Sequence, residues 1–390
     1  MNIKTTLTAN KENFFFLWCY FFFLIFISGF FFSDTSKPLN NIFYISLCLP
    51  ALIITIRDRK NMFSREPFFI LFFALALWII LTAIISPGQT SGTLKELKPL
   101  IYVFFLSIIV FYLFQKRKNV PLILSYVILI SASASGALFL FDFYEPRNWN
   151  FARRLLGHGS LSNSIWVGAA YGFAAIISIN LFLHEKWLKY QITALCLGII
   201  PFIIMLATQS RGPLAAFAAA LIFSLFSYRN KRALLLTVLG MICVTFIFFH
   251  HSESIDQTRL LKSGDSYRIA IWSNAIDEII KAPFIGHGIS ADSENHFQNR
   301  TFDHFHNVYL TLAFHTGIIG LLLFLPLILY PLFSFKNGET RLLKSMLIFG
   351  MVYMIFNASR LFTSPKEIWL IFWVPLLFLW ANNKYRKTHG

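Results

Sequence analysis

Residues 14–32 read FFFLWCYFFFLIFISGFFF, and this stretch contains no charged side chain. A helix of roughly 20 apolar residues is long enough to cross the hydrocarbon core of a bilayer. The stretch also lacks the small-residue cleavage site that ends a secretory signal peptide. We therefore expect it to be a retained first membrane span, and similar apolar runs recur along the whole chain.

The composition supports a membrane protein. Of the 390 residues, 56% are hydrophobic, 18% are aromatic and only 13% are charged, and 46 are phenylalanine. A soluble domain has roughly a quarter of its residues charged. The apolar runs do not show the alternation over about 10 residues that barrel strands need. The composition therefore predicts an all-α polytopic membrane protein.

The hydropathy pattern predicts about twelve transmembrane helices, which places both termini on one side of the membrane. We expect the spans near Phe14–Phe32, Leu39–Ile56, Phe68–Ser86, Pro99–Phe114, Pro121–Phe141, Ser164–Leu183, Trp187–Ala207, Pro213–Ser227, Ala233–Phe249, Asn307–Phe333, Leu342–Phe362 and Ile368–Ala381.

The basic residues orient this arrangement. Three short loops, Arg57–Arg65, Lys116–Lys118 and Arg229–Arg232, are densely basic, and cytoplasmic loops carry such an excess. Both termini are thus predicted to be cytoplasmic. The net charge of +16 then reports topology, and we expect membrane lipids rather than nucleic acid as partners.

The chain divides into three predicted parts. Residues 1–249 hold helices 1–9, residues 250–306 form one larger periplasmic loop domain containing helices, and residues 307–390 hold helices 10–12 and a cytoplasmic tail. The loop has an expected helix with Ser266 as N-cap and an apolar stripe at Ile269, Trp272, Ile276 and Ile279. Pro283 and Gly286 would end that helix.

Two arginines at the predicted outer surface are candidates for anion binding. Arg211 lies between two spans, before the helix-breaking Gly212 and Pro213. An arginine at the membrane is energetically costly, so its presence indicates a function. The alternative is an interfacial side chain that reaches the lipid headgroups. Arg268 falls in the first turn of the loop helix, where free N–H groups and the helix dipole favour a phosphate. The alternative for Arg268 is an ordinary solvated position.

A histidine motif opens the span after the long loop. His304 and His306 lie beside Asp303 and Asn307, and a histidine near neutral pH can act as a general base. A metal site would need third and fourth ligands at suitable spacing, and the sequence offers none. We therefore expect no metal. His287, His296 and His315 are interpreted as structural or exposed.

Two further arginines lie on the predicted outer side, and a nucleotide-binding motif is missing from the predicted cytoplasmic side. Arg153 and Arg154 are candidates for binding an anionic headgroup or sugar phosphate, or are simple loop charges. The cytoplasmic loops contain no glycine-rich nucleotide motif. An energised donor would therefore have to be linked to a lipid, and no cofactor is expected.

Four motifs in this order resemble one known family. They are Ser210-Arg211-Gly212, Tyr267-Arg268 with Trp272, Pro283 with Gly286-His287-Gly288, and His306-Asn307-Val308-Tyr309-Leu310 followed by Gly317 and Gly320. Together with the single large loop they resemble the O-antigen ligase and polymerase superfamily over most of the chain.

The resemblance implies a GT-C-like membrane fold in the bacterial inner membrane and a periplasmic active site. It implies an undecaprenyl-diphosphate-linked glycan as donor and lipid A-core as acceptor. Arg211 and Arg268 would clamp the diphosphate, and His306 would deprotonate the acceptor hydroxyl, with His304 as an alternative base. Direct attack at the anomeric carbon would invert its configuration.

Three readings stay open at this point. An O-antigen ligase is preferred. An O-antigen polymerase or a protein O-oligosaccharyltransferase would use the same donor chemistry. A transporter or flippase of lipid-linked glycans would bind the same donor without reacting, but it should carry charges near mid-membrane, and the inner parts of these spans lack them.

Overall fold

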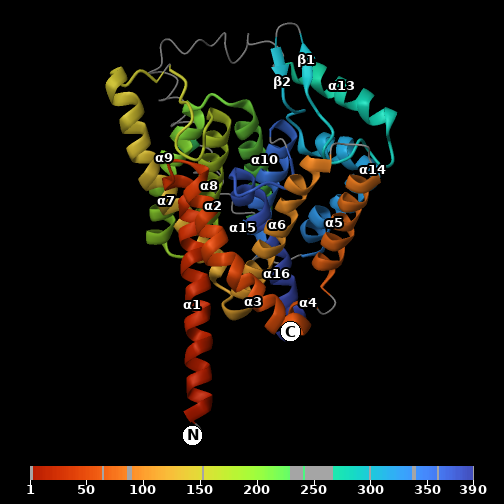
Figure 1. Ribbon diagram of the computed structural model, residues 1–390. Helices are drawn as coiled ribbons and strands as arrows, with labels where there is room; N and C mark the ends of the chain where they lie inside the picture. The colour runs from red at the N-terminus through yellow and green to blue at the C-terminus, as the bar shows by residue number, and fades with distance from the viewer. Residues whose placement is uncertain are drawn as a thin grey trace.

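The computed structural model in Figure 1 describes residues 3–63, 66–85, 90–151, 153–228, 240–241, 267–297, 300–335, 340–357 and 360–389. The helices and strands are α1 (Ile3–Phe32), α2 (Ser36–Phe43), η1 (Tyr44–Cys48), α3 (Leu49–Arg57), α4 (Arg59–Phe63), α5 (Pro67–Ile85), α6 (Thr90–Lys116), α7 (Val120–Tyr144), η2 (Glu145–Arg147), α8 (Ser164–His184), α9 (Leu188–Ala207), α10 (Arg211–Tyr228), α13 (Arg268–Lys281), β1 (Asn295–Phe297), β2 (Arg300–Phe302), α14 (Val308–Ser334), α15 (Arg341–Phe356), η4 (Trp369–Trp373) and α16 (Val374–His389).

Within these described residues, nine helices are long and apolar enough to cross a membrane. Each of the nine coincides with a predicted span, and η4 with α16 adds a shorter apolar helix, Trp369–Asn383. The predicted span Ala233–Phe249 lies outside the described residues apart from positions 240–241. The chain is therefore an all-α polytopic membrane protein.

The predicted span Leu342–Phe362 is too long. Helix α15 ends at Phe356, because Asn357 is extended (φ −160°, ψ 178°). Asn357 and Arg360, which lie beyond the helix, line the cavity of His304 and His306 described below. The early end of α15 thus shortens this span and supplies side chains to that cavity.

Helix α8 lies at the centre of the bundle, with nearly every residue buried. Small residues make this packing close: a β-carbon on Gly168 would lie 2.7 Å from Oγ1 of Thr208, and one on Gly172 would lie 2.8 Å from Sδ of Met205. Small residues spaced in this way let membrane helices approach each other.

A buried polar cluster joins α8 to two other helices. Asn180 on α8 donates to Oγ of Ser345 on α15 (2.9 Å), and Ser224 on α10 donates to Oδ1 of Asn180 (3.2 Å). Hydrogen bonds of this kind hold helices together where water is absent. Elsewhere the outward faces are apolar: Phe14, Phe226 and Ile84 are 67%, 79% and 74% exposed, as expected for side chains that face lipid.

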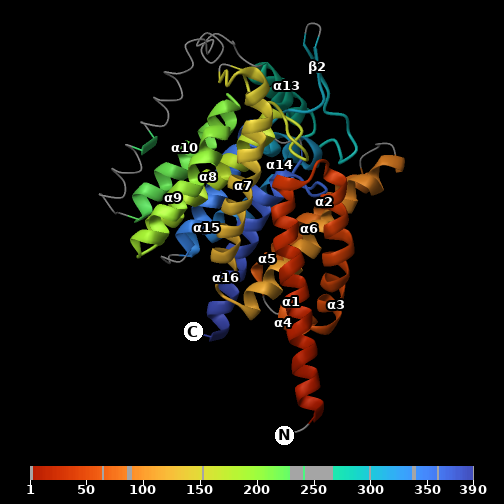
Figure 2. The ribbon, with the colours of Figure 1, turned by 90° about the vertical axis from the view of Figure 1, so that its left-hand side faces the viewer.

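The predicted loop helix exists as α13, and a small antiparallel hairpin of β1 and β2, which was not predicted, follows it. Figures 1 and 2 show both at the end of the molecule opposite to the first turn of α1 and the last turn of α16. The predicted N-cap Ser266 lies outside the described residues, and Tyr267 (φ 57°) takes the cap position.

The predicted apolar stripe of α13 is partly wrong. Ile271 and Ala275 are the buried residues, whereas Ile269 and Ile276 are 71% and 49% exposed. The helix carries isoleucines on more than one face, so spacing alone could not select the packed one. The buried face packs against Phe305 and Phe314 in a second small apolar core.

Main-chain hydrogen bonds attach this loop region to α14. The amide of His287 donates to the carbonyl of Phe314 (2.8 Å), that of Gly288 to His315 (3.0 Å) and that of Ile318 to Pro283 (2.8 Å). Helix α14 is kinked at this point, where Gly317 has φ 67° and ψ −176°. The kink frees the carbonyl groups that the loop region uses.

Candidate functional site

His306 lies just before α14, where Phe305 anchors the chain. The side chain of Phe305 is 1% exposed, and its carbonyl accepts a hydrogen bond from Nε1 of Trp272 (3.1 Å). His306 itself adopts φ 53°, a conformation that is costly for a residue with a side chain and is common at functional sites. The turn places the rings of His304 and His306 with their centroids 4.1 Å apart.

Both histidines line a cavity of about 130 Å³, which also contains Asn357 and Glu367. Burial and, as the next cause, the neighbouring His306 lower the pKa of His304 to about 4. Burial also lowers the pKa of His306 below its ordinary value of 6.5, with the charge of Arg268 as the next cause. Both imidazoles are therefore neutral at pH 7, as a general base must be.

One ring nitrogen of His306 is uncommitted. Its Nδ1 atom is buried and has no hydrogen-bond partner among the described residues. A buried polar atom in that state is unfavourable unless a ligand or water completes it. A neutral imidazole with an unused nitrogen has the chemistry needed to take a proton from a hydroxyl group.

Arg268 is the first residue of α13, and its charge acts on both His306 and Tyr353 of α15. The side chain of the N-cap residue Tyr267 makes no capping hydrogen bond. The first turn of a helix with a guanidinium beside it favours an anion. The structure thus brings two predicted residues, Arg268 and His306, close enough to interact electrostatically.

Arg211 begins α10 directly after a tight turn, in which Gln209 has φ 48°. The next residue, Gly212, packs under α15: a β-carbon there would lie 3.0 Å from Cβ of Phe356. The ring of Phe356 also lies 6.4 Å from that of Trp272 on α13. The first turns of α10 and α13, each starting with a predicted arginine, therefore meet around the C-terminal end of α15.

Arg154 has a structural role that the sequence did not reveal. Its Nε donates to the carbonyl of Thr208 (2.8 Å) and its Nη2 to Oγ of Ser210 (3.2 Å). These bonds hold the turn that presents Arg211. Arg153 contributes its carbonyl to the hydroxyl of Tyr144 (2.9 Å), and its side chain is exposed. The predicted contacts of both arginines with substrate stay predictions.

Asn307 likewise has a structural role. Its Oδ1 accepts from the amides of Tyr309 (2.9 Å) and Leu310 (3.2 Å) and so caps α14. Such a cap contributes about 1 kcal/mol to the stability of a helix. The carboxamide oxygen is thereby occupied, and the predicted binding of substrate by Asn307 would fall to its NH2 group.

Glu367 is a site residue that the sequence analysis missed. It is 3% exposed, its Oε1 accepts from the hydroxyl of Tyr353 at 3.5 Å, and its Oε2 is buried without a partner among the described residues. Burial raises its pKa to about 7. Asn357 donates to the same Tyr353 hydroxyl (2.6 Å), which links Glu367 to the residues around His306. A carboxylate at the start of the last apolar run was the available signal.

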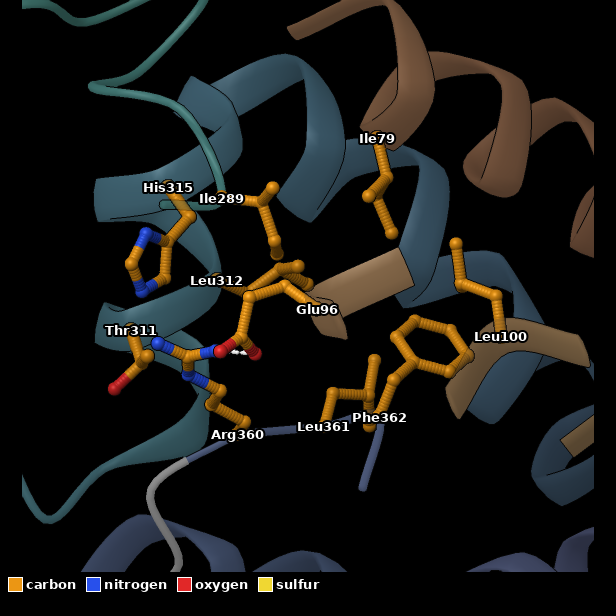
Figure 3. Close-up of a pocket in the computed structure, with 10 residues that line it drawn as sticks. All are labelled: Ile79, Glu96, Leu100, Ile289, Thr311, Leu312, His315, Arg360, Leu361 and Phe362. Carbon is orange, nitrogen blue, oxygen red and sulfur yellow. Dashed lines mark ion pairs between the residues drawn. The ribbon is translucent and has the colours of Figure 1, made fainter. Parts of the chain in front are cut away.

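A smaller cavity shares Arg360 with the cavity of His304 and His306 (Figure 3). The guanidinium of Arg360 points at the carboxylate of Glu96 and forms an ion pair with it, beside Thr311 and His315. His315 is itself buried, with Nδ1 bound to the carbonyl of Gly288 (2.8 Å), as its structural interpretation expects. Since Arg360 is balanced by Glu96, its charge is already matched within the protein.

In the described part of the chain, no three His, Cys, Asp or Glu side chains gather as a metal ion would require. The side chain of His296 lies outside what the structure describes. The expected independence from metal stays a prediction.

Fold and site together define a polytopic membrane protein whose reactive groups gather at one end of the helix bundle. The comparison with known families agrees with the predicted resemblance: the family model described as O-antigen ligase matches residues 196–325, which include Arg211, Arg268, His304 and His306. The chain is also 26% identical over 371 residues to an O-antigen ligase of Pseudomonas aeruginosa, covering 92% of this chain and 88% of that protein. The resemblance to the O-antigen ligase family is thus confirmed.

Proposed function

We propose that this protein is an O-antigen ligase of the bacterial inner membrane, which transfers a glycan from undecaprenyl diphosphate to lipid A-core. The single observation that carries the proposal is the buried His306, whose Nδ1 has no partner among the described residues and whose pKa is lowered by burial and by Arg268. The proximity of Arg268 to His306 supports a base and a cation that act together. The similarity to O-antigen ligases supports the choice of substrates.

The reaction follows from the roles of these residues. His306 takes the proton of an acceptor hydroxyl, and the hydroxyl oxygen forms a bond to the anomeric carbon of the glycan. The bond between that carbon and the diphosphate oxygen breaks, and the electron pair leaves with the diphosphate. Arg268 and Arg211 stabilise the negative charge that develops there. A single displacement inverts the anomeric configuration, and the two guanidinium groups serve in place of a metal ion.

Topology supports the proposed side of the reaction. The first turn of α1 and the last turn of α16 lie at one end of the bundle, and α13 lies at the other (Figure 1). The densely basic loops predict that the end with the termini is cytoplasmic. The residues of the proposed site, in the loop domain 250–306 and the ends of the neighbouring spans, would then face the periplasm. This matches a lipid-linked donor that is used outside the reach of cytoplasmic nucleotides.

The test is transfer by the purified protein in detergent. Undecaprenyl-diphosphate glycan is the donor and rough lipopolysaccharide is the acceptor, with EDTA present, and wild type is compared with His306→Ala. Glycan on lipid A-core that is lost in the variant supports a metal-independent ligase with His306 as its base. Full activity in His306→Ala but not in His304→Ala would move the base to His304.

The same assay separates the alternatives. A donor that is extended on its own lipid would identify a polymerase, and glycan found on an added acceptor protein would identify an O-oligosaccharyltransferase. No product of any kind, beside an active control enzyme, would overturn the proposed chemistry and favour a transporter.

A further inference from the structure

A second cavity, of about 310 Å³, lies beside the histidine cavity, and Trp166, Lys366 and Glu367 line both. The other walls of the second cavity come mainly from the α1–α2 corner and the loop before α8, where the polar Asp34, Ser36 and Ser160 alternate with apolar residues such as Phe30 and Leu39. The two cavities therefore form one path that leads from His306 to the outer end of α1.

We propose that this path binds the saccharide that accepts the glycan, with Trp166 as the apolar platform for a sugar ring and Glu367 as the acceptor of a sugar hydroxyl. This inference rests on the proposed function and deepens it, since it assigns a place to the second substrate. A sugar ring has an apolar C–H face and hydroxyl groups around its edge. An aromatic side chain can pack against that face while a buried carboxyl group accepts a hydrogen bond from a hydroxyl.

Glu367 is the main observation. Its carboxyl group is 3% exposed and lines both cavities, and its Oε2 lacks a hydrogen-bond partner among the described residues. An unsatisfied buried oxygen costs roughly 1–3 kcal/mol. A hydroxyl group from a bound sugar would satisfy it, within the same cavity as the proposed base.

Trp166 is held firmly at the boundary between the cavities. Asn163 caps α8 by accepting from the amides of Ile165 (3.0 Å) and Trp166 (2.9 Å), which fixes the first turn of that helix. The indole is half-buried, and the ammonium of Lys366 lies 5.3 Å from its ring centre. Lys366 is itself exposed, so its long side chain can make room for a sugar or bind an acidic group on it.

The remaining walls are fixed by bonds between distant segments. The amide of Ser160 donates to the carbonyl of Ser33 (2.7 Å), and its hydroxyl donates to the carbonyl of Phe30 (3.2 Å). On the opposite side, Nε1 of Trp369 donates to the carbonyl of Thr363 (3.0 Å). Walls held in this way keep their shape before a ligand arrives, which lowers the entropic cost of binding.

The position of the path favours the acceptor over the donor. Neither Arg211 nor Arg268 lines the two cavities, although Arg268 acts on His306. The diphosphate would therefore approach His306 from the side of α10 and α13. The path of Trp166 and Glu367 reaches the same histidine from the side of α1 and α8.

The experiment measures binding of delipidated core oligosaccharide from rough lipopolysaccharide to the purified full-length protein, and in parallel the acceptor KM and the donor KM of transfer. The variants are Trp166→Ala and Glu367→Gln. Their matched controls are Trp187→Ala and Glu12→Gln, because both of these residues are exposed and lie outside the two cavities.

We expect each cavity variant to weaken oligosaccharide binding and raise the acceptor KM by about tenfold or more, while the donor KM stays within about twofold of wild type. Binding and acceptor KM equal to those of the controls would overturn the proposal. Ser36→Trp, which fills the second cavity from a different element, is expected to give the same loss. It replaces any cavity variant that does not elute as a single folded species.

Failure of this inference is distinguishable from failure of the proposed function. Wild-type transfer with an unchanged acceptor KM in all three variants refutes the acceptor path and leaves the ligase intact. Oligosaccharide binding that depends on Trp166 and Glu367, without any transfer by wild type, supports the path and refutes the ligase.

Discussion

The backbone of Gly317 lies directly against the carbonyl oxygen of Phe284, so close that a β-carbon at position 317 would overlap with that oxygen. Gly317 has φ 67°, and it marks the kink of α14 at which the loop region is attached. The contact links the segment after α13 to the span that carries His306 at its start. Two of the family motifs, around Gly286 and around Gly317, are therefore two sides of one contact.

Gly317→Ala is expected to destabilise the folded protein by roughly 2–4 kcal/mol, because the substitution adds both a strained backbone and a steric overlap. Thermal unfolding in detergent would measure the loss as a lower midpoint. Gly240→Ala is the matched control, since a β-carbon there meets no atom of the described residues within 4 Å. Equal midpoints for the two variants would contradict the contact.

Arg268→Ala and Arg211→Ala are each expected to lower the transfer rate by about 10²–10³-fold, because each removes a charge that stabilises the diphosphate leaving group. Lysine in place of either arginine keeps the charge but not the two-pronged hydrogen bonding, so an intermediate loss is expected. Membrane insertion and elution should match wild type. Near-normal transfer by one alanine variant would remove that arginine from the proposed clamp.

Arg154→Ala should weaken transfer by roughly tenfold, because its bonds to Thr208 and Ser210 hold the turn before Arg211. Its neighbour supplies the control: Arg153→Ala leaves the carbonyl that binds Tyr144 in place and should cost less than about threefold. The donor KM and the rate of transfer would be measured for both. A larger effect at Arg153 would instead support the predicted contact of Arg153 with substrate.

The rate of transfer should depend on pH through His306. The base works only when it is neutral, and its pKa lies below 6.5. Saturated turnover is therefore expected to be level between about pH 7 and 8 and to fall about tenfold per unit at pH values below that pKa. Burial lowers the pKa of His306 most and the charge of Arg268 lowers it as well, whereas Asn357 and Asp303 raise it.

Asp303 provides the test of that assignment. Its negative charge raises the pKa of His306 against the effect of burial. Asp303→Asn should accordingly move the acidic limb of the rate profile to lower pH, with the plateau preserved. A limb that stays in place would show that another group controls it.

The spans could be predicted because lipid leaves the chain little choice. Runs such as 14–32 and 68–86 must cross the bilayer as helices, and the structure has apolar helices of sufficient length there, Glu12–Phe32 and Pro67–Ile85. Packing decided what periodicity could not: α15 ends at Phe356 because Asn357 is extended and buried, and α13 buries Ile271 in place of Ile269.

The site residues were predictable where a single polar side chain is energetically costly to place beside a membrane. An arginine between spans and a histidine at a helix start stand out in the sequence, and the structure brings Arg268 to act on His306. Glu367 does not stand out, because beside Lys366 it resembles a solvated pair at the end of a span. Its burial depends on how α15 and α8 pack around it, which no local pattern records.

The attachment of the loop region to α14 uses amide and carbonyl groups, at His287, Gly288 and Ile318. Every residue type except proline offers the same groups, so substitutions around the glycines leave this joint intact. The cavities beside His306 can thus acquire new side chains that suit a different sugar, while the loop region stays attached to α14 in the same position. Sequences that are only 26% identical over their aligned length are compatible with such a joint, because it depends on no particular side chain.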